Sequence, residues 1–296
     1  MSVTGTEIRY LLGIDGGGTK TEFLLTDLDG NEIKRTILGP SNPMNIGFEN
    51  AKNILCDGIN EVSPGIPKNL ISVFAGIAGV TDPESNKKIQ ELFESLEFGK
   101  SSISSDIDSA LEVALKGKNG IMIIIGTGIA AFTQKGNERH RISGWGYLID
   151  KGGSGFHLGS AAFESAFSFI DGRGGSEKML RLIEERLEYP LVDSIGEIYS
   201  KGNSFIASFS PVVFTAYRDG DIFAEEILKR NTKEIAEIIT AGRKFAPDGK
   251  VVFCGGLGKE KEILTPFINA HLPEETEIEF CNEPTVNGAV SLAGKL

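Results

Sequence analysis

Asp15 stands directly before three glycines and Thr19 in the segment IDGGGTK. Glycines tolerate positive φ and let a ligand approach the backbone, so such a turn can offer N–H groups to phosphate oxygens. A carboxylate at a strand end suits Mg²⁺, which takes one or two carboxylates beside phosphate. The glycines precede a strand and lack a Gly-Lys-Ser/Thr ending, which excludes a Walker A loop and a dinucleotide fingerprint. Residues 11–26 therefore predict a glycine hairpin that either binds phosphate or is only a turn.

A second glycine turn, Gly126-Thr127-Gly128, repeats this form between two apolar runs but has no acid before it. Internal duplication is more specific than either copy alone. It predicts two similar domains, residues 1–117 and 118–296, each offering one glycine hairpin to the same ligand across a cleft. A final helix opened by Pro284 is expected to pack back on the first domain.

Strands and helices alternate around the first turn. Three strands within residues 11–37 precede a helix over 48–62, a strand over 70–77 and a helix opened by Asp82. This order indicates a mixed sheet with helices on its faces. The later segments are a strand over 101–105 with a helix after it, a largely helical stretch over 157–245, strands over 250–254 and 277–280, and a glycine loop over 255–258.

Composition narrows the class of protein. A length of 296 residues fits about two domains, and 40% apolar residues suffice for their cores. A net charge of −11 argues against nucleic acid or an anionic membrane as partner. The N-terminus has no signal-peptide pattern and no apolar run reaches membrane-spanning length, so we expect a cytoplasmic protein. The three cysteines, Cys56, Cys254 and Cys281, are widely spaced and predict buried, reduced thiols.

In order and spacing these motifs resemble the sugar kinase/heat-shock chaperone/actin superfamily. Within it, the chain resembles the BadF/BadG/BcrA/BcrD ATPase family, whose nearest enzymes are N-acetylglucosamine kinases. The resemblance covers nearly the whole chain. It implies an α/β fold of two ribonuclease H-like (actin-like ATPase) domains, with mixed five-stranded sheets around an interdomain cleft. It also implies ATP and Mg²⁺ as cofactors, a homodimer, and phosphorylation of the 6-hydroxyl of an amino sugar such as N-acetylglucosamine, N-acetylmuramic acid or glucosamine.

The resemblance also assigns residues to roles. Asp15 matches the metal-side carboxylate and Asp106 the general base. The nucleotide contacts it implies are Gly16, Gly17, Gly18, Thr19, Lys20, Gly126, Thr127, Gly128, Gly255, Gly256 and Gly258. The substrate contacts it implies are Asn42, Gly79, Asp106, Gly128, Gly144, Trp145, Gly146, Asp150 and Lys151.

Several of these residues also have a purely structural interpretation. An Asp just before a helix is a favoured N-cap, so Asp106 can be a cap and not a base, although we expect Asp108 to be the cap. Asn42 precedes a proline and can simply form the turn. Trp145 is the only tryptophan, and its ring can cover a sugar face or fill a core.

One position departs from the family pattern. Amino-sugar kinases read Gly-Asp-Glu-Gly-Ser where this chain has Asp150-Lys151-Gly152-Gly153-Ser154. Lys151 replaces an acid that contacts substrate hydroxyls, and a lysine donates hydrogen bonds but cannot accept them. Either Asp150 takes over the contact or the substrate has changed. Lys151 can favour an acidic sugar such as N-acetylmuramic acid.

Two other functions remain open from the sequence. An activator ATPase coupled to electron transfer would carry an iron–sulfur cluster bridged between subunits by cysteines. No cysteine lies between Cys56 and Cys254, where the resemblance would place those ligands. A non-catalytic sugar sensor is the third possibility, and the presence of Asp106 argues against it.

Overall fold

The computed structural model describes residues 7–296 and divides them into two units, which are described separately. Unit 1 comprises the chain up to Lys116 together with Glu283–Leu296, and unit 2 comprises Gly117–Asn282. The last helix is thus grouped with the N-terminal part of the chain.

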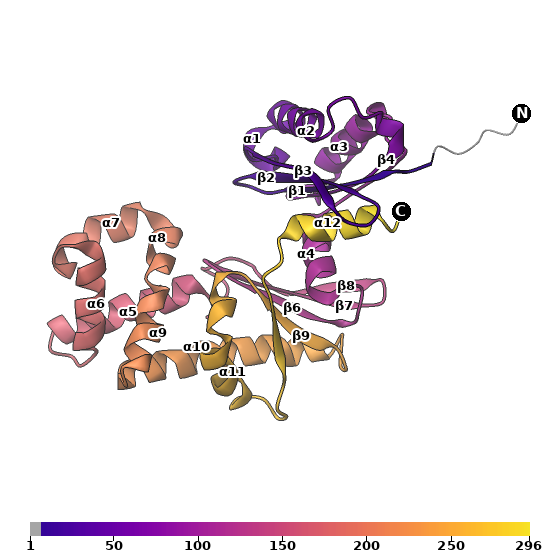
Figure 1. Ribbon diagram of the computed structural model, residues 1–296. Helices are drawn as coiled ribbons and strands as arrows, with labels where there is room; N and C mark the ends of the chain where they lie inside the picture. Colours follow the sequence, from indigo (N-terminus) through magenta and orange to yellow (C-terminus); the bar gives the residue numbers. More distant parts are fainter. Residues whose placement is uncertain (1–6) are drawn as a thin grey trace, which may run out of the picture. The chain divides into compact units, whose positions relative to one another are not determined.

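Unit 1 is built on a five-stranded mixed sheet in the order β3-β2-β1-β4-β5 (Figure 1). β1 is antiparallel to β2 and parallel to β4, which is itself parallel to β5. The strands are β1 Tyr10–Gly16, β2 Thr21–Asp27, β3 Glu32–Leu38, β4 Ile71–Ile77 and β5 Lys100–Ser104. The helices are α1 Pro43–Ile46, α2 Phe48–Val62, α3 Pro83–Ser95, α4 Asp106–Leu115 and α12 Thr285–Ala293.

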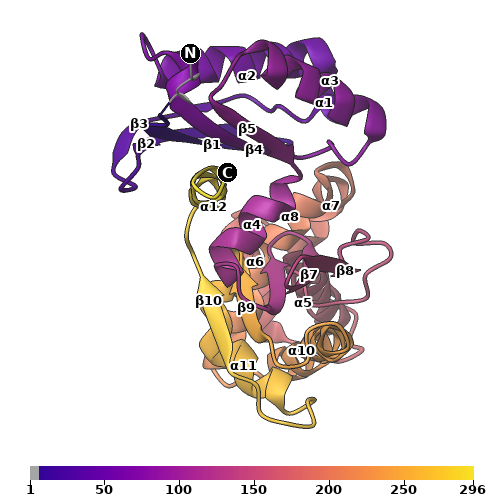
Figure 2. The same cartoon turned by 90° about the vertical axis from the view of Figure 1, so that its right-hand side faces the viewer.

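Helices cover both faces of this sheet because alternate residues of its strands are apolar on both sides. Leu12 and Ile14 of β1 point into a core with Leu55 and Ile59 of α2. The opposite face includes Leu11, which packs against α12. Figure 2 shows α2 and α3 on one side of the sheet and α12 on the other. The helices on both faces hold the strands of this sheet in place, and the predicted site residues of unit 1 lie at the ends of those strands.

Unit 2 repeats the same sheet in the order β8-β7-β6-β9-β10. Its strands are β6 Gly120–Ile125, β7 Ile129–Lys135, β8 Glu138–Ser143, β9 Lys250–Cys254 and β10 Ile278–Cys281. Its helices are α5 Gly155–Ile170, α6 Glu177–Leu187, α7 Ile195–Ser200, α8 Gly202–Ser208, α9 Ser210–Arg218, α10 Ile222–Arg243 and α11 Lys261–Asn269, with a short 3-10 turn, η3, over Gly256–Glu260.

The two sheets match strand for strand, since each has a central strand that begins an antiparallel hairpin and continues the sheet in parallel on its other side. The predicted pair of mixed five-stranded sheets is therefore confirmed. The core of unit 2 lies between Ile121 and Ile123 of β6 and the helices α5, α9 and α10. Within residues 7–296, no helix has the length and apolarity needed to cross a membrane.

Candidate active site

The register of the unit 1 sheet brings Asp15 and Asp106 to one edge. Asp15 on β1 pairs with Gly76 on β4, and Gly76 pairs with Ser104 at the end of β5. These three strands are parallel, so their carboxyl ends meet, and α4 begins at Asp106 just beyond β5. A Cβ on Gly76 would lie 3.2 Å from the Cα of Asp106, so β4 and the start of α4 are in close contact. The predicted metal-side acid and the predicted base are therefore neighbours.

Burial and like charge change the acidity of both carboxyl groups. Burial, followed by the negative charges of Asp106 and Glu22, raises the pKa of Asp15 to about 6. Burial also raises the pKa of Asp106, although the Ser105 hydroxyl, 3.1 Å from its Oδ1, donates a hydrogen bond that lowers it. A raised pKa strengthens a carboxylate as a proton acceptor, as general-base catalysis requires.

The prediction that Asp108 caps α4 was wrong. The N-cap is Ser105, whose Oγ accepts a hydrogen bond from Ile107 N at 3.3 Å. Asp108 lies in the first turn and accepts a hydrogen bond from the Ser104 hydroxyl. Because Ser105 supplies the cap, Asp106 is not needed for it, which weakens the structural interpretation of Asp106.

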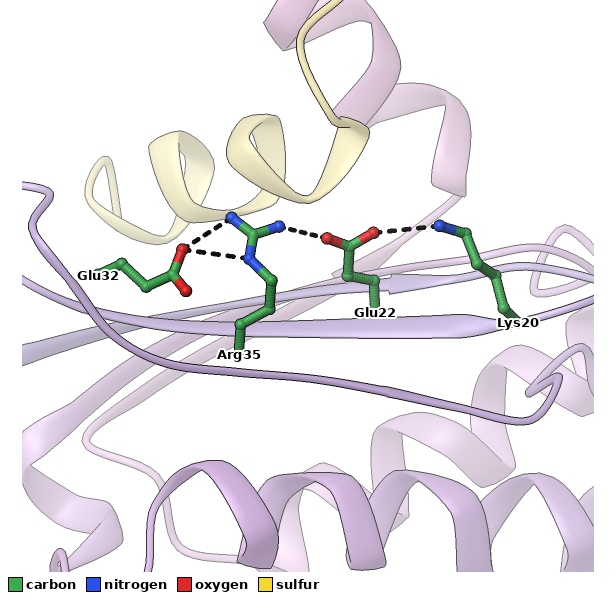
Figure 3. A network of polar contacts seen from close by, with 4 residues as sticks. All are labelled: Lys20, Glu22, Glu32 and Arg35. Carbon is green, nitrogen blue, oxygen red and sulfur yellow. Dashed lines mark hydrogen bonds and ion pairs between the residues drawn. The ribbon is translucent and has the colours of Figure 1, made fainter.

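Glu22 lies opposite Asp15 in the register of β1 and β2, and it belongs to a row of four charged side chains (Figure 3). Its carboxylate accepts from Lys20 Nζ at 3.3 Å and pairs with Arg35 of β3, which also donates to Glu32 at 2.9 Å. The Glu22 side chain is only 9% exposed, so these cations offset the penalty of burying its charge. The row holds Lys20, a predicted nucleotide contact, beside the carboxyl end of β1.

The first glycine turn is closed by a hydrogen bond from Gly17 N to Lys20 O of 2.9 Å, and Gly18 and Thr19 are exposed on it. The loop before α1 packs against this turn, because Ser41 N donates to Gly17 O at 3.2 Å. A Cβ on Gly16 would lie 2.4 Å from Ser41 Oγ, so a larger residue at position 16 would displace that loop.

Asn42 and Gly79 are brought together beside this turn. Asn42 is the N-cap of α1, and its Oδ1 accepts from Met44 N at 2.9 Å. A Cβ on Gly79 would lie 2.3 Å from the same Oδ1, and Gly79 has a φ of +86°. The Asn42 oxygen therefore forms the turn, while its amide nitrogen has no hydrogen-bond partner within residues 7–296 and is the group that can reach a ligand.

In unit 2 the second glycine turn lies against the N-terminus of α5. Gly155 N and Phe156 N donate to the carbonyl oxygens of Gly126 and Thr127 at 2.8 and 3.0 Å. Thr127 and Gly128 are exposed, and a Cβ on Gly126 or Gly128 would meet nothing within 4 Å. The predicted second phosphate loop is thus a fixed turn with an open outer surface.

The third glycine loop follows β9 and adjoins the second turn. Gly255 has a φ of +88°, and a Cβ there would lie 2.6 Å from Ile125 O, the carbonyl just before the second turn. Gly256 is exposed, and a Cβ on it would meet nothing within 4 Å. Gly258 is buried, since a Cβ there would lie 2.1 Å from the ring of Phe280. Within this loop Gly256 presents open backbone and Gly258 packs against β10.

Trp145 is 60% exposed, which excludes the alternative that its ring fills a core. It stands between Gly144 and Gly146, whose φ values of +106° and +104° turn the chain out of the end of β8. A Cβ on Gly144 would lie 2.7 Å from the Cβ of Ala130, at the start of β7. The Trp145 turn therefore adjoins the strand that leaves the second glycine turn.

Two charged side chains hold the Trp145 turn. The Arg141 guanidinium lies 4.5 Å from the centre of the Trp145 ring, and it donates to the carbonyl oxygens of Ser143, at 3.3 Å, and of Gly144. The Asp150 carboxylate accepts from Gly144 N at 3.3 Å and from Gly146 N at 2.9 Å. We call Arg141 and Asp150 the turn brace.

Lys151 and Asp150 therefore differ in their surroundings. Asp150 is half-buried and its oxygens are bonded to the turn, whereas Lys151 is exposed. In the part of the chain that the structure describes, no carboxylate lies within ion-pair distance of Lys151. The Lys151 ammonium group therefore forms no ion pair within residues 7–296.

Three contributing residues were missed from the sequence. Thr285, the first residue of α12, donates a hydrogen bond to Asp15 that lowers its pKa. Gly76 allows the start of α4 to approach β4 closely, and Arg141 stacks on Trp145. Of the three, only Gly76 could have been found from the sequence, by its position at a strand end. The Thr285 contact depends on how distant segments fold together, and the Arg141 contact depends on the shape of a tight turn.

The residues beside Asp15 suit a magnesium ion carried by a nucleotide. The carboxylates of Asp106 and Glu22 already raise the pKa of Asp15, so a cation bound there would relieve their repulsion. Within residues 7–296, no group of three or more His, Cys, Asp or Glu side chains could hold a metal ion by itself. Magnesium at Asp15 would therefore take its other ligands from phosphate and water.

The duplicated α/β fold, with one mixed five-stranded sheet in each unit, is shared by solved structures of proteins named as sugar kinases. A candidate N-acetylglucosamine kinase of Chromobacterium violaceum has the same fold, with a TM-score of 0.71, 24% identity, and coverage of 97% of this chain and 99% of that one. A model of the BadF/BadG/BcrA/BcrD ATPase family matches residues 12–291, and the chain belongs to that family.

Two curated relatives have related names. The N-acetylmuramic acid/N-acetylglucosamine kinase of Clostridium acetobutylicum is 32% identical over 97% of this chain and 98% of its own length. The N-acetyl-D-glucosamine kinase of Dictyostelium discoideum is 27% identical over 90% of this chain and 91% of its own. The resemblance seen in the sequence is thereby confirmed at the level of the family.

Proposed function

We propose that this protein is an ATP-dependent kinase that phosphorylates the 6-hydroxyl of an amino sugar, with N-acetylglucosamine as its principal substrate. The relatives in Clostridium acetobutylicum and Dictyostelium discoideum, which match nearly the full chain, support the reaction class. The observation that carries the residue assignment is the position of Asp106 beside Asp15, at the shared carboxyl edge of three parallel strands.

Asp106 acts in this proposal as the general base. Phosphoryl transfer to an alcohol needs a group that accepts the hydroxyl proton while the phosphate oxygens are held and shielded. The raised pKa of Asp106 fits a carboxylate that takes this proton and later releases it to water. Asp15 would hold Mg²⁺, and the bound ion would shield the phosphate charge. The exposed turns of the three glycine loops would contact ATP.

A coupled ADP-release assay tests this function with glucosamine, N-acetylglucosamine, N-acetylmuramic acid and glucose. We expect Asp106→Asn to lower kcat by about 10²–10⁴-fold, the usual contribution of a general base, while the KM values change little. Asp108→Asn is the matched control, because it makes the same change in the same helical turn. Equal losses in both variants, or no turnover with any amino sugar, would refute the proposal.

We further propose that Lys151 allows N-acetylmuramic acid to serve as a second substrate, because its ammonium group can pair with the carboxylate of that sugar. The side chain is exposed and unpaired with any acid in residues 7–296, while the neighbouring Asp150 is engaged by the turn. Lys151→Ala should lower kcat/KM for N-acetylmuramic acid and leave the value for N-acetylglucosamine nearly unchanged. An unaltered ratio of the two values would exclude this role.

A further inference from the structure

Cys254 and Cys281 are neighbours, although they are far apart in the sequence. Cys254 ends β9 and Cys281 ends β10, and the two residues pair directly in the parallel register of these strands. Figure 2 shows β9 and β10 side by side. Adjacent strands lie about 4.7–4.9 Å apart, and paired residues point to the same face of the sheet. That separation falls within the Cα–Cα range of about 4.4–6.8 Å found for disulfides.

The thiols of the two residues also interact. A hydrogen bond joins them, and burial, followed by the proximity of the Cys281 thiol, raises the pKa of Cys254 to about 12. Both residues are half-buried, not buried as the sequence predicted, and neither is in a disulfide. The pair is therefore close enough to join and open enough for a small oxidant to reach.

Each cysteine is next to a residue that shapes the third glycine loop. Cys254 is followed directly by Gly255, and a Cβ on Gly255 would clash with the backbone of Ile125. Phe280, just before Cys281, packs its ring against Gly258. Little space is left at either contact, so a change in the spacing of β9 and β10 must move the loop.

We propose that Cys254 and Cys281 form an oxidation site at which a peroxide or a small-molecule disulfide closes an intrachain disulfide. With hydrogen peroxide, the Cys281 thiolate attacks a peroxide oxygen, expels hydroxide and becomes a sulfenic acid, because the raised pKa of Cys254 keeps that residue in its thiol form. The second thiol attacks that sulfur and the oxygen leaves as water. The two sulfurs lose two electrons, one peroxide is reduced, and two waters form. We further infer that this disulfide weakens ATP binding at the third glycine loop. This second part of the proposal rests on the proposed kinase function.

Intact-mass spectrometry after treatment with hydrogen peroxide, and separately with oxidised glutathione, tests the first step. We expect a loss of about two mass units, reversed by dithiothreitol, and a cross-linked peptide pair containing residues 254 and 281. Cys56→Ser should behave like the parent chain, whereas Cys254→Ser and Cys281→Ala should each fail to form the link. Oxidation to sulfinic acid, glutathione adducts without a cross-link, or a bond to Cys56 would overturn the proposal.

The ADP-release assay tests the second step on the same samples. The oxidised protein should show a KM for ATP raised about fivefold or more, the lower end of typical coupling between sites, with the KM for the sugar unchanged. A cross-linked protein with an unaltered KM for ATP would overturn the proposed link to nucleotide binding. A protein that forms the disulfide but has no kinase activity before oxidation would refute the kinase function and leave the oxidation site intact.

Discussion

Arg141 offers the sharpest test of how the Trp145 turn is held. The substitution Arg141→Gln removes a guanidinium that lies 4.5 Å from the Trp145 ring centre and donates to two carbonyl oxygens. If the turn contacts the sugar, a looser turn must be ordered again when the sugar binds. The substitution should therefore weaken sugar binding while leaving the rest of the fold in place.

The size of the effect follows from these contacts. A cation–π contact at an exposed site contributes about 0.5–1 kcal/mol, and a typical hydrogen bond about 0.5–1.5 kcal/mol net. We take the low end of the range for the two hydrogen bonds, because both are partly exposed to solvent. The contacts of Arg141 then stabilise the turn by about 1.5–2 kcal/mol. Since 1.4 kcal/mol is a factor of ten, the sugar KM should rise roughly 10–30-fold if all of this energy is coupled to binding.

The single tryptophan makes a direct assay possible. Trp145 is the only such residue, so tryptophan emission, excited at wavelengths that the five tyrosines hardly absorb, reports on this turn alone. We expect Arg141→Gln to change the emission of the free protein and to shift its titration with N-acetylglucosamine to higher concentration. Arg141→Lys should restore part of the cation–π contact but not the two-carbonyl geometry. ADP-release kinetics should show the sugar KM raised and the ATP KM unchanged.

A matched control separates this role from a general loss of charge. Arg181→Gln makes the same change on α6, where Arg181 pairs with Glu177 of the same helix and with no other acid among the described residues. It should leave both KM values unaltered. If Arg141→Gln leaves the emission and the sugar KM within twofold of the parent chain, the brace does not support binding. An equal rise in both KM values would show that the substitution disturbs the whole unit.

Three further outcomes follow from the site. Asp15→Asn should stabilise the protein at pH 7.5 by up to about 3 kcal/mol. The pKa of Asp15 is about 6 in the folded protein and 3.8 as the ordinary value, so the parent chain loses folding stability as the pH rises from 4 to 6. The gain in melting temperature of the variant should therefore vanish near pH 4. Gly258→Ala should lower the melting temperature by the equivalent of about 1–3 kcal/mol, because its Cβ would meet the Phe280 ring, while Gly256→Ala should not. Asp150→Ala should raise the sugar KM more than Asp150→Asn, which keeps one acceptor oxygen, and ADP-release kinetics will compare them.

The strands and their order were within reach of the sequence because local signals define them. Apolar runs that end in glycine marked both central strands, and the repeat of this pattern implied two sheets of one kind. The position of Asp106 just after a strand also followed from local order. These features depend on neighbours in the sequence, which is why they could be predicted.

The missed contacts depend on register and on the shape of turns. Thr285 reaches Asp15 only because the last helix returns to the first sheet. Cys254 meets Cys281 only because β9 and β10 pair in one particular register. Arg141 reaches Trp145 because two glycines with positive φ turn the chain back on itself. None of these three contacts can be predicted from the spacing of the residues along the chain.

The two sheets differ in the residues at the ends of their central strands, and under the proposed function this difference assigns catalysis to one unit and binding to the other. The first central strand carries Asp15 just before its last residue, Gly16, whereas the second ends in Ile125, a buried apolar residue. Both acids assigned to the reaction therefore lie in unit 1, and unit 2 contributes exposed turns and the Trp145 loop. Removing an acid in unit 1 should change the rate of the chemical step and so lower kcat, while altering a turn in unit 2 should change binding and so raise KM. If substitutions at the unit 2 turns lowered kcat as far as Asp106→Asn does, the duplication would have to be understood as two cooperating catalytic halves.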